Sequence, residues 1–133
     1  MTSKQIAFLI GSLFWMLSTP TMAQSSNDWV AIKDPQELRA LYSNKTLRGK
    51  GGDGSLFVAH YSADGRGILI QGDRRTPRKW TIKGKDQVCV THDSGTDCFT
   101  FERHRKNRNE IIARHVTQPW SFQATVEDGI PKF

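Results

Sequence analysis

Short segments in which apolar and polar residues alternate are the feature of this chain that most restricts its fold. They lie at 56–61 (LFVAHY), 67–71, 79–83, 87–92, 97–104, 109–116 and 120–126, with a weaker one at 45–49. Turns rich in glycine, aspartate and asparagine separate them at a spacing of roughly ten residues, as expected for strands joined in hairpins. The pattern therefore predicts an antiparallel meander rather than β–α–β units.

Closure of this meander into a barrel is the expected outcome, because a twisted sheet with many hairpins tends to curl and hide its edges. A barrel of about eight strands has room for a packed interior or for one small ligand. The sequence therefore predicts a mainly β fold, a small antiparallel up-and-down β-barrel of the lipocalin or calycin kind.

One short helix is predicted ahead of the strands, over residues 34–42 (DPQELRALY). Asp34 is a good N-cap, Pro35 suits the first helical position, and Glu37 completes a capping box. An apolar stripe at helical spacing follows, made of Leu38, Leu41 and Tyr42. We expect this N-terminal helix, about two turns long, to plug or flank one end of the barrel.

The two cysteines, Cys89 and Cys98, test the register of the central hairpin. If the turn centres on 93–94, Cys89 lies opposite Cys98 and Val88 lies opposite Phe99. Side chains alternate between the two faces of a strand, so one register satisfies both the apolar pairing and a disulfide on the outer face. In an oxidising compartment we expect this disulfide, with two free thiols as the alternative.

The first 23 residues have the pattern of a cleavable signal peptide. A charged start with Lys4 precedes an uncharged apolar run over 6–17, and small residues lead up to Ala23. The apolar run has about 12 residues, whereas a membrane span needs roughly 20. We therefore expect cleavage after Ala23, a periplasmic or secreted location, and no transmembrane span in the mature form.

The mature chain is expected to begin with a polar segment over 24–33 and to form one β-barrel-like domain over 34–133. Cleavage would leave 110 of the 133 residues, a length that suits a single domain. Loss of Lys4 would lower the formal net charge from +6 to +5. The mature protein should therefore be small, basic and soluble.

The order of several short motifs gives a further indication. The helix DPQELRAL is followed by NKTLRG, an aromatic strand ending in DG, WTIKG, CV and CF, and finally VEDGIP at 126–131. In this order the chain, over residues 34–133, resembles a family of bacterial secreted proteins known as domain of unknown function 995. The resemblance implies an exported, small, β-rich protein and no particular activity or catalytic residue.

Patterns of catalytic and metal-binding residues are weak in this sequence. The four histidines, His60, His92, His104 and His115, have no metal-ligand spacing, so surface or rim positions are the simpler interpretation. The serines form no nucleophile elbow, and the glycine-rich run 49–54 lacks the ending of a phosphate loop. We therefore predict no catalytic residues, no metal site and no cofactor. Only a clustered His–Asp pair in a pocket, assembled by folding, would favour a hydrolase.

Seven aromatic side chains on the predicted strands are the candidate wall of a ligand pocket. A solid aromatic core is the simpler alternative, because buried aromatic residues more often pack against one another than line a pocket. The candidate pocket residues are Phe57, Tyr61, Trp80, Phe99, Phe101, Trp120 and Phe122.

Two basic clusters are the candidate contacts for a polyanion: Arg74, Arg75, Arg78 and Lys79, and further along Arg103, Arg105, Lys106 and Arg108. Because successive turns of a meander alternate between its ends, the clusters should lie at opposite ends of the barrel. A solvated, solubilising surface is the simpler interpretation. Outside the cytoplasm, anionic envelope lipids or polysaccharides fit such a surface better than nucleic acid does.

Together these observations favour an exported, non-enzymatic binding protein of the periplasm or envelope. Its ligand would be a small or lipid-like molecule, or an envelope component, held within or at the mouth of the barrel. The alternatives are a polyanion- or protein-binding module that uses the basic loops 74–79 and 103–108, and a hydrolase whose site is not visible in the sequence.

Overall fold

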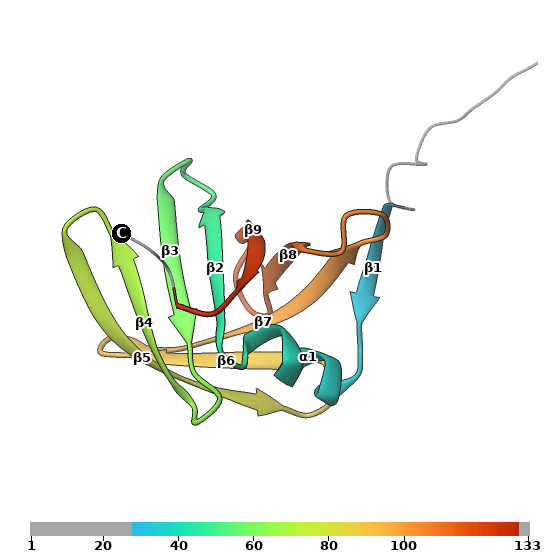
Figure 1. Cartoon of the computed structure of the whole chain (residues 1–133), viewed down its shortest axis with the longest axis horizontal. Helices are drawn as coiled ribbons and strands as arrows, with labels where there is room; N and C mark the ends of the chain where they lie inside the picture. Colours follow the sequence, from blue (N-terminus) through green and yellow to red (C-terminus); the bar gives the residue numbers. More distant parts are fainter. Residues whose placement is uncertain (1–27, 131–133) are drawn as a thin grey trace, which may run out of the picture.

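The protein is a closed antiparallel β-barrel with one short helix, described by a computed structural model over residues 28–130 (Figure 1). Each barrel strand pairs with the next along the chain, and the last pairs with the first to close the barrel. The predicted up-and-down β-barrel is therefore confirmed. The predicted signal peptide, residues 1–23, lies outside the described residues. The barrel strands are β2 (Lys45–Lys50), β3 (Leu56–Tyr61), β4 (Arg66–Gln71), β5 (Arg74–Lys83), β6 (Gln87–His92), β7 (Gly95–His104), β8 (Glu110–His115) and β9 (Ser121–Asp128).

The two ends of the barrel differ. One end carries the helix α1 (Pro35–Tyr42), which contacts β2, β5 and β6. We call the opposite end the mouth, and it is formed by the turns 51–55, 72–73, 93–94 and 116–120. Within residues 28–130, no helix has the length and apolar character needed to cross a membrane.

Helix α1 covers the end opposite the mouth with its predicted apolar stripe. The side chains of Leu38, Leu41 and Tyr42 are all buried. Asp34 caps the helix by accepting a hydrogen bond from the Gln36 N–H at 3.0 Å. The capping-box prediction for Glu37 is corrected, since its carboxylate accepts a hydrogen bond from Arg103 Nη1 at 2.8 Å. An ion pair to β7 is the stronger interaction for this carboxylate, because Arg103 is charged and only 19% exposed.

The hairpin of β6 and β7 has the predicted register. Cys89 lies opposite Cys98, and Val88 lies opposite Phe99. The two cysteines form a disulfide. Val88 and Phe99 belong to the buried core, so the disulfide lies on the outer face of the barrel wall, where it joins the two strands covalently.

Strand β5 is longer than its sequence pattern predicts. It runs over Arg74–Lys83 rather than 79–83, because the turn before it contains only Gly72 and Asp73. Gly72 has φ 58°, the left-handed conformation that a tight turn requires. The inward positions Thr76 and Arg78 are polar, so this half of the strand carries no apolar alternation to reveal it.

A ninth strand, β1 (Trp29–Ile32), was not predicted from the sequence. It pairs with the second half of β7, where Ile32 lies opposite Phe101, whereas β6 pairs with the first half. Ile32 is 3% exposed and anchors the strand in the core. Four residues beside a polar segment are too short to show a period of two.

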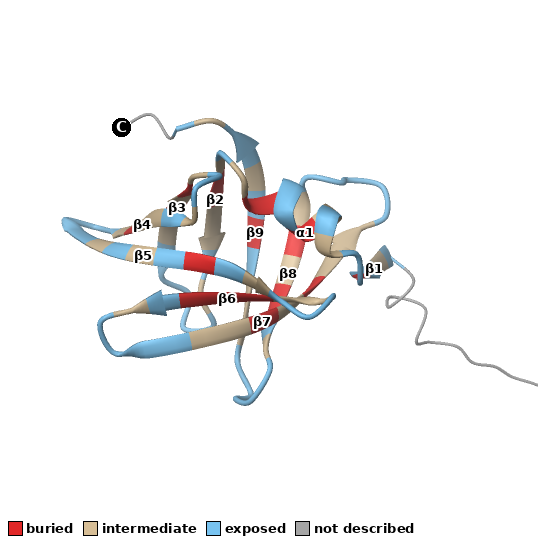
Figure 2. Cartoon of the chain, turned by 90° about the horizontal axis from the view of Figure 1, so that it is seen from below, coloured by how far each residue is buried: buried red, intermediate tan, exposed pale blue. Residues whose placement is uncertain are grey.

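One hydrophobic core lies between α1 and the strands (Figure 2). Two inward glycines allow aromatic rings from the neighbouring strand to lie across the sheet. A Cβ at Gly67 would lie 2.5 Å from Tyr61 Cδ1, and a Cβ at Gly49 would lie 2.7 Å from Phe57 Cζ. Each glycine is the direct cross-strand partner of the ring that covers it, an arrangement that compensates for the missing side chain.

Candidate ligand-binding cavity

A cavity of about 170 Å³ lies inside the barrel and extends from Tyr42 of α1 to Gly51 and Trp120 at the mouth. Its wall is mostly apolar, with a few polar side chains, as in typical sites for small molecules. The polar side chains are Gln71, Arg78 and Asp97. The apolar and aromatic side chains are Tyr42, Leu47, Phe57, Ala59, Tyr61, Leu69, Val90, Phe99, Trp120 and Phe122.

The structure brings most of the predicted pocket residues together around this cavity. Phe57, Tyr61, Phe99, Trp120 and Phe122 line it. The other two predicted residues, Trp80 and Phe101, lie outside the lining and pack against Tyr42, with ring centroids 5.5 and 5.8 Å from its ring. The sequence pattern assigned Tyr42 to the helix stripe, so its place in the cavity was missed.

Aromatic rings make the wall nearest the mouth. The Phe99 ring is central, with centroids 5.4 Å from Trp120 and 5.3 Å from Phe122. Phe57 packs edge-on against Phe122 at 5.2 Å. Trp120 is 39% exposed and belongs to the turn 116–120, so it forms part of the rim. A ligand entering through the mouth would contact this ring.

Two tyrosines form the inner part of the cavity, with ring centroids 4.6 Å apart. Burial raises the pKa of Tyr61 to about 12, although the charge of Arg78 and a hydrogen bond from it act in the opposite direction. Burial also raises the pKa of Tyr42 well above its usual value. Both phenols are therefore neutral hydroxyls at physiological pH and can donate or accept a hydrogen bond.

Arg78, predicted as a polyanion contact on the surface, lines the cavity. On β5 it lies opposite Gly67 of β4, and Gly67 in turn lies opposite Tyr61 of β3. Because Gly67 has no side chain, the guanidinium group reaches across β4 to the Tyr61 hydroxyl. The wall thus presents one cation beside one hydroxyl.

Asp97 joins two histidines at the mouth. Its Oδ2 lies 2.7 Å from His92 Nε2, and its Oδ1 lies 2.9 Å from His115 Nε2. Burial raises the pKa of Asp97, but hydrogen bonds from His115 and His92 outweigh burial, so the pKa is lower than its ordinary value. The carboxylate therefore stays ionised with both oxygens engaged.

Three histidines end their strands in the same way, with Nδ1 accepting backbone N–H groups of the following turn. His92 accepts from Ser94 at 3.2 Å, His104 from Lys106 at 3.2 Å and Asn107 at 3.0 Å, and His115 from Thr117 and Gln118, both at 3.2 Å. An accepting Nδ1 places the proton of the neutral ring on Nε2. In His92 and His115 this proton is donated to Asp97.

The His92–Asp97–His115 cluster is a His–Asp arrangement of the kind that would favour a hydrolase, but its contacts indicate a structural role. Each ring has both nitrogens in hydrogen bonds, so neither offers a free lone pair to a substrate. The Thr117 hydroxyl oxygen lies 3.3 Å from His115 Nδ1, which already accepts two backbone N–H groups. The His115 side chain is only 4% exposed and lies at the end of β8, beside the mouth turn 116–120.

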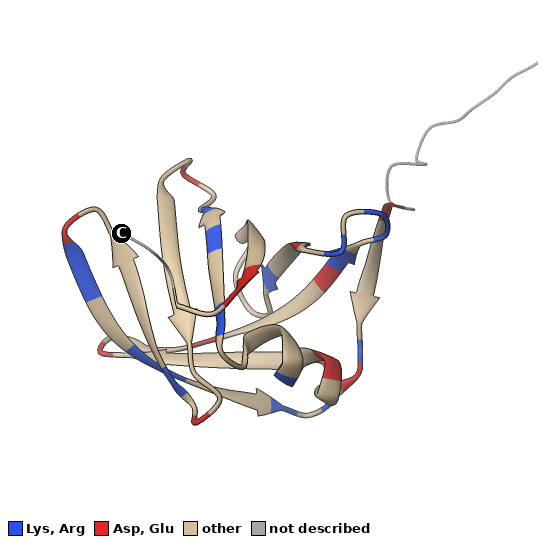
Figure 3. Ribbon diagram, viewed as in Figure 1, with Lys and Arg blue, Asp and Glu red and all other residues tan. Residues whose placement is uncertain are grey.

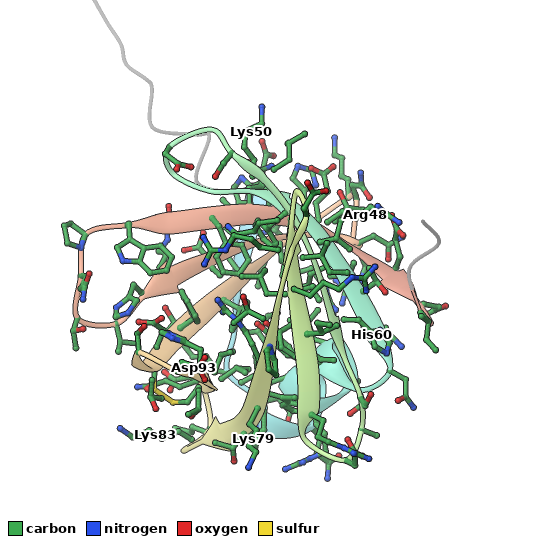
Figure 4. The ribbon with its side chains drawn as sticks, turned by 90° about the vertical axis from the view of Figure 1, so that its left-hand side faces the viewer. Arg48, Lys50, His60, Lys79, Lys83 and Asp93 are labelled. Carbon is green, nitrogen blue, oxygen red and sulfur yellow. A yellow bond between two sulfur atoms is a disulfide. The ribbon has the colours of Figure 1, made fainter. Side chains whose placement is uncertain are left out.

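The other predicted polyanion contacts lie on two sides of the molecule (Figure 3). Exposed basic residues of β5 occupy one side, and Lys79 points outward from it (Figure 4). The turn 105–109 occupies the opposite side, at the end of the barrel away from the mouth, whereas the first cluster runs along β5 from the mouth, so the two clusters do not form one patch. Their binding of a polyanion stays a prediction. The exposed members are Arg74, Arg75 and Lys79, and Arg105, Lys106 and Arg108, whereas Arg103 is largely buried beside Glu37.

A larger and more open hollow, of about 750 Å³, lies on the outer face of the barrel. Charged side chains border it, including Arg48, Glu110 and Arg114. Arg48 pairs with Glu127, and Arg114 pairs with Glu102. Since Arg48 and Arg114 are already paired with carboxylates, the internal cavity is the better candidate site. Among residues 28–130 there is no group of three or more side chains arranged to hold a metal ion.

Comparison with known proteins gives no match to a family model, a curated protein or a solved structure. The cavity and its lining residues are therefore the features that indicate a function.

Proposed function

We propose that this protein is an exported binding protein that holds a small, largely apolar ligand inside its barrel. The observation that carries the proposal is the cavity between Tyr42 and the mouth, lined by aromatic rings and a few polar groups. Chemistry at the His92–Asp97–His115 cluster is disfavoured by its engaged ring nitrogens. Binding without turnover is what this arrangement supports.

The volume of the cavity restricts the size of the ligand. Cavities of roughly 150 Å³ in protein cores accept benzene, and this one measures about 170 Å³. A single-ring or short branched molecule would fit without displacement of the wall. A long lipid chain would have to project through the mouth past Trp120, so we favour a small ligand over a lipid-like one.

Export is supported by two independent features. The signal-peptide pattern ends at Ala23, and the Cys89–Cys98 disulfide fits an oxidising compartment such as the periplasm or the extracellular space. Membership of the secreted family known as domain of unknown function 995 would agree with this location, and we retain it as part of the proposal.

Isothermal titration calorimetry with toluene, benzyl alcohol and benzoate tests the proposed binding, with tryptophan emission as a second readout. We expect saturable binding of at least one compound to the oxidised protein, accompanied by a change in emission. The W120F variant should lose most of this change, because Trp120 lines the cavity. W29F is the matched control and should keep it, since Trp29 lies on β1 beside His104. Absence of saturable binding for the whole panel would overturn the proposal.

A further inference from the structure

Arg78 is a cation without an anionic partner. Its Nε is buried and has no hydrogen-bond partner among the described residues. None of the ion pairs found within residues 28–130 includes it. Arg103 also has a buried, unpartnered Nε, but its Nη1 is paired with Glu37. A guanidinium group that is partly removed from water and left unpaired is costly, so its missing acceptor calls for an explanation.

The wall of the cavity does not supply that acceptor. Asp97 is the one carboxylate that lines the cavity in the described part of the chain. Both of its oxygens already accept hydrogen bonds, from His92 and His115. The hydroxyl beside Arg78 belongs to Tyr61, which is neutral. The charge of Arg78 is therefore directed at space that a ligand can occupy.

We infer that the cavity binds a small monocarboxylic acid with an apolar body, and that Arg78 holds its carboxylate. This inference rests on the proposed ligand-binding function and names the chemical class of its ligand. A guanidinium group can pair with a carboxylate through two parallel N–H···O bonds, and the Tyr61 hydroxyl is placed to add a third. The body of the ligand lies against Phe57, Phe99 and Phe122.

The charge on Asp97 limits the ligand to one negative charge. Arg78 and Asp97 line the same cavity with opposite signs, so a monoanion on Arg78 leaves the cavity with a single net negative charge. A dianion, such as a phosphate monoester, would add a second charge in a space of low polarity, where repulsion is poorly screened. The site should therefore prefer benzoate over phenyl phosphate.

Titration of matched aromatic probes into the oxidised protein tests the inference by calorimetry. The probes are benzoate, its neutral isostere benzamide, phenyl phosphate and toluene. We expect benzoate to bind at least tenfold more tightly than benzamide or phenyl phosphate. In R78Q this preference should disappear while toluene still binds. K79Q removes the same charge from the adjacent, outward-facing residue (Figure 4) and should keep the preference.

The possible results separate this inference from the proposed function. Equal affinities for benzoate and benzamide, or an unchanged preference in R78Q, would overturn the assignment of Arg78 and leave apolar binding intact. Failure of all four probes to bind would overturn both. R78K is a second variant that tests the inference if R78Q does not fold. Lysine keeps the positive charge of Arg78 but lacks its planar guanidinium group. R78K should bind benzoate more weakly than the wild type does, but more tightly than R78K binds benzamide. Equal affinities of R78K for benzoate and benzamide would also contradict the inference.

Discussion

At the scale of single residues, Asp97 connects parts of the mouth that are distant in the sequence. Through His92 it holds the turn between β6 and β7, and through His115 it holds the loop that leads to β9. Each histidine in turn fixes backbone N–H groups of its own loop. One carboxylate therefore orders two of the loops that form the rim of the cavity.

Replacement of Asp97 by asparagine should destabilise the protein in a pH-dependent way. The folded pKa is lowered by the hydrogen bonds from His115 and His92, which outweigh burial, so the ionised group stabilises the fold above its unfolded pKa. This contribution is lost as the pH falls through the lowered folded value. We expect D97N to cost about 1–3 kcal/mol at pH 7 and less at pH 3.

Chemical denaturation of the wild type and D97N at several pH values checks this expectation. D93N is a suitable control, because Asp93 is exposed in the same hairpin turn and should change stability little. A difference between the wild type and D97N that is the same at pH 3 and pH 7 would contradict the role given to the Asp97 carboxylate.

At the scale of elements, β4 depends on a position without a side chain. Gly67 lies between Tyr61 on β3 and Arg78 on β5. Tyr61 is 4% exposed and packs against Tyr42, so any shift of the ring away from Gly67 would disturb this contact. The contact between two strands that are not neighbours is thus made over the backbone of the strand between them.

Gly67→Ala should therefore destabilise the barrel by about 1–3 kcal/mol, because an added methyl group would force the buried Tyr61 ring out of its position. Thermal unfolding followed by circular dichroism measures the effect. Gly52→Ala is the matched control, since the nearest atom to its Cβ would be Ser121 O at 3.7 Å. A loss of stability in G52A as large as that in G67A would contradict this explanation.

The elements also show what the sequence can and cannot predict. The β6–β7 hairpin was predictable in detail, because Val88, Phe99 and the two cysteines require the same register. The first half of β5 was not, since its inward residues Thr76 and Arg78 are polar and resemble a turn. For the same reason Arg78 was assigned to the surface, and only folding brings it beside Tyr61. Asp97 was missed because its partners, His92 and His115, come from different hairpins.

At the scale of the whole molecule, the disulfide stabilises a barrel whose core is small. Nine positions separate Cys89 from Cys98 in the sequence, and a bridge that closes so short a loop stabilises a fold by about 2–3 kcal/mol. The C89A/C98A variant should therefore fold but unfold at a lower temperature than the oxidised wild type. Reductant should lower the unfolding temperature of the wild type and leave that of C89A/C98A unchanged. Equal sensitivity of the two proteins to reductant would contradict a stabilising role for the disulfide.

The pairing of β2 with β9 determines when the chain can finish folding. Arg48 and Lys45 of β2 form ion pairs with Glu127 and Asp128 of β9, and Thr46 donates a hydrogen bond to the Gly129 carbonyl at 2.6 Å. Contacts between residues so far apart in a chain form slowly, because a long loop must close first. Until β9 has left the ribosome or a translocation channel, β2 has a partner on one side only. A chain that is exported as we propose would therefore remain an open, threadable polymer during its passage, and the last strand to arrive would complete the barrel.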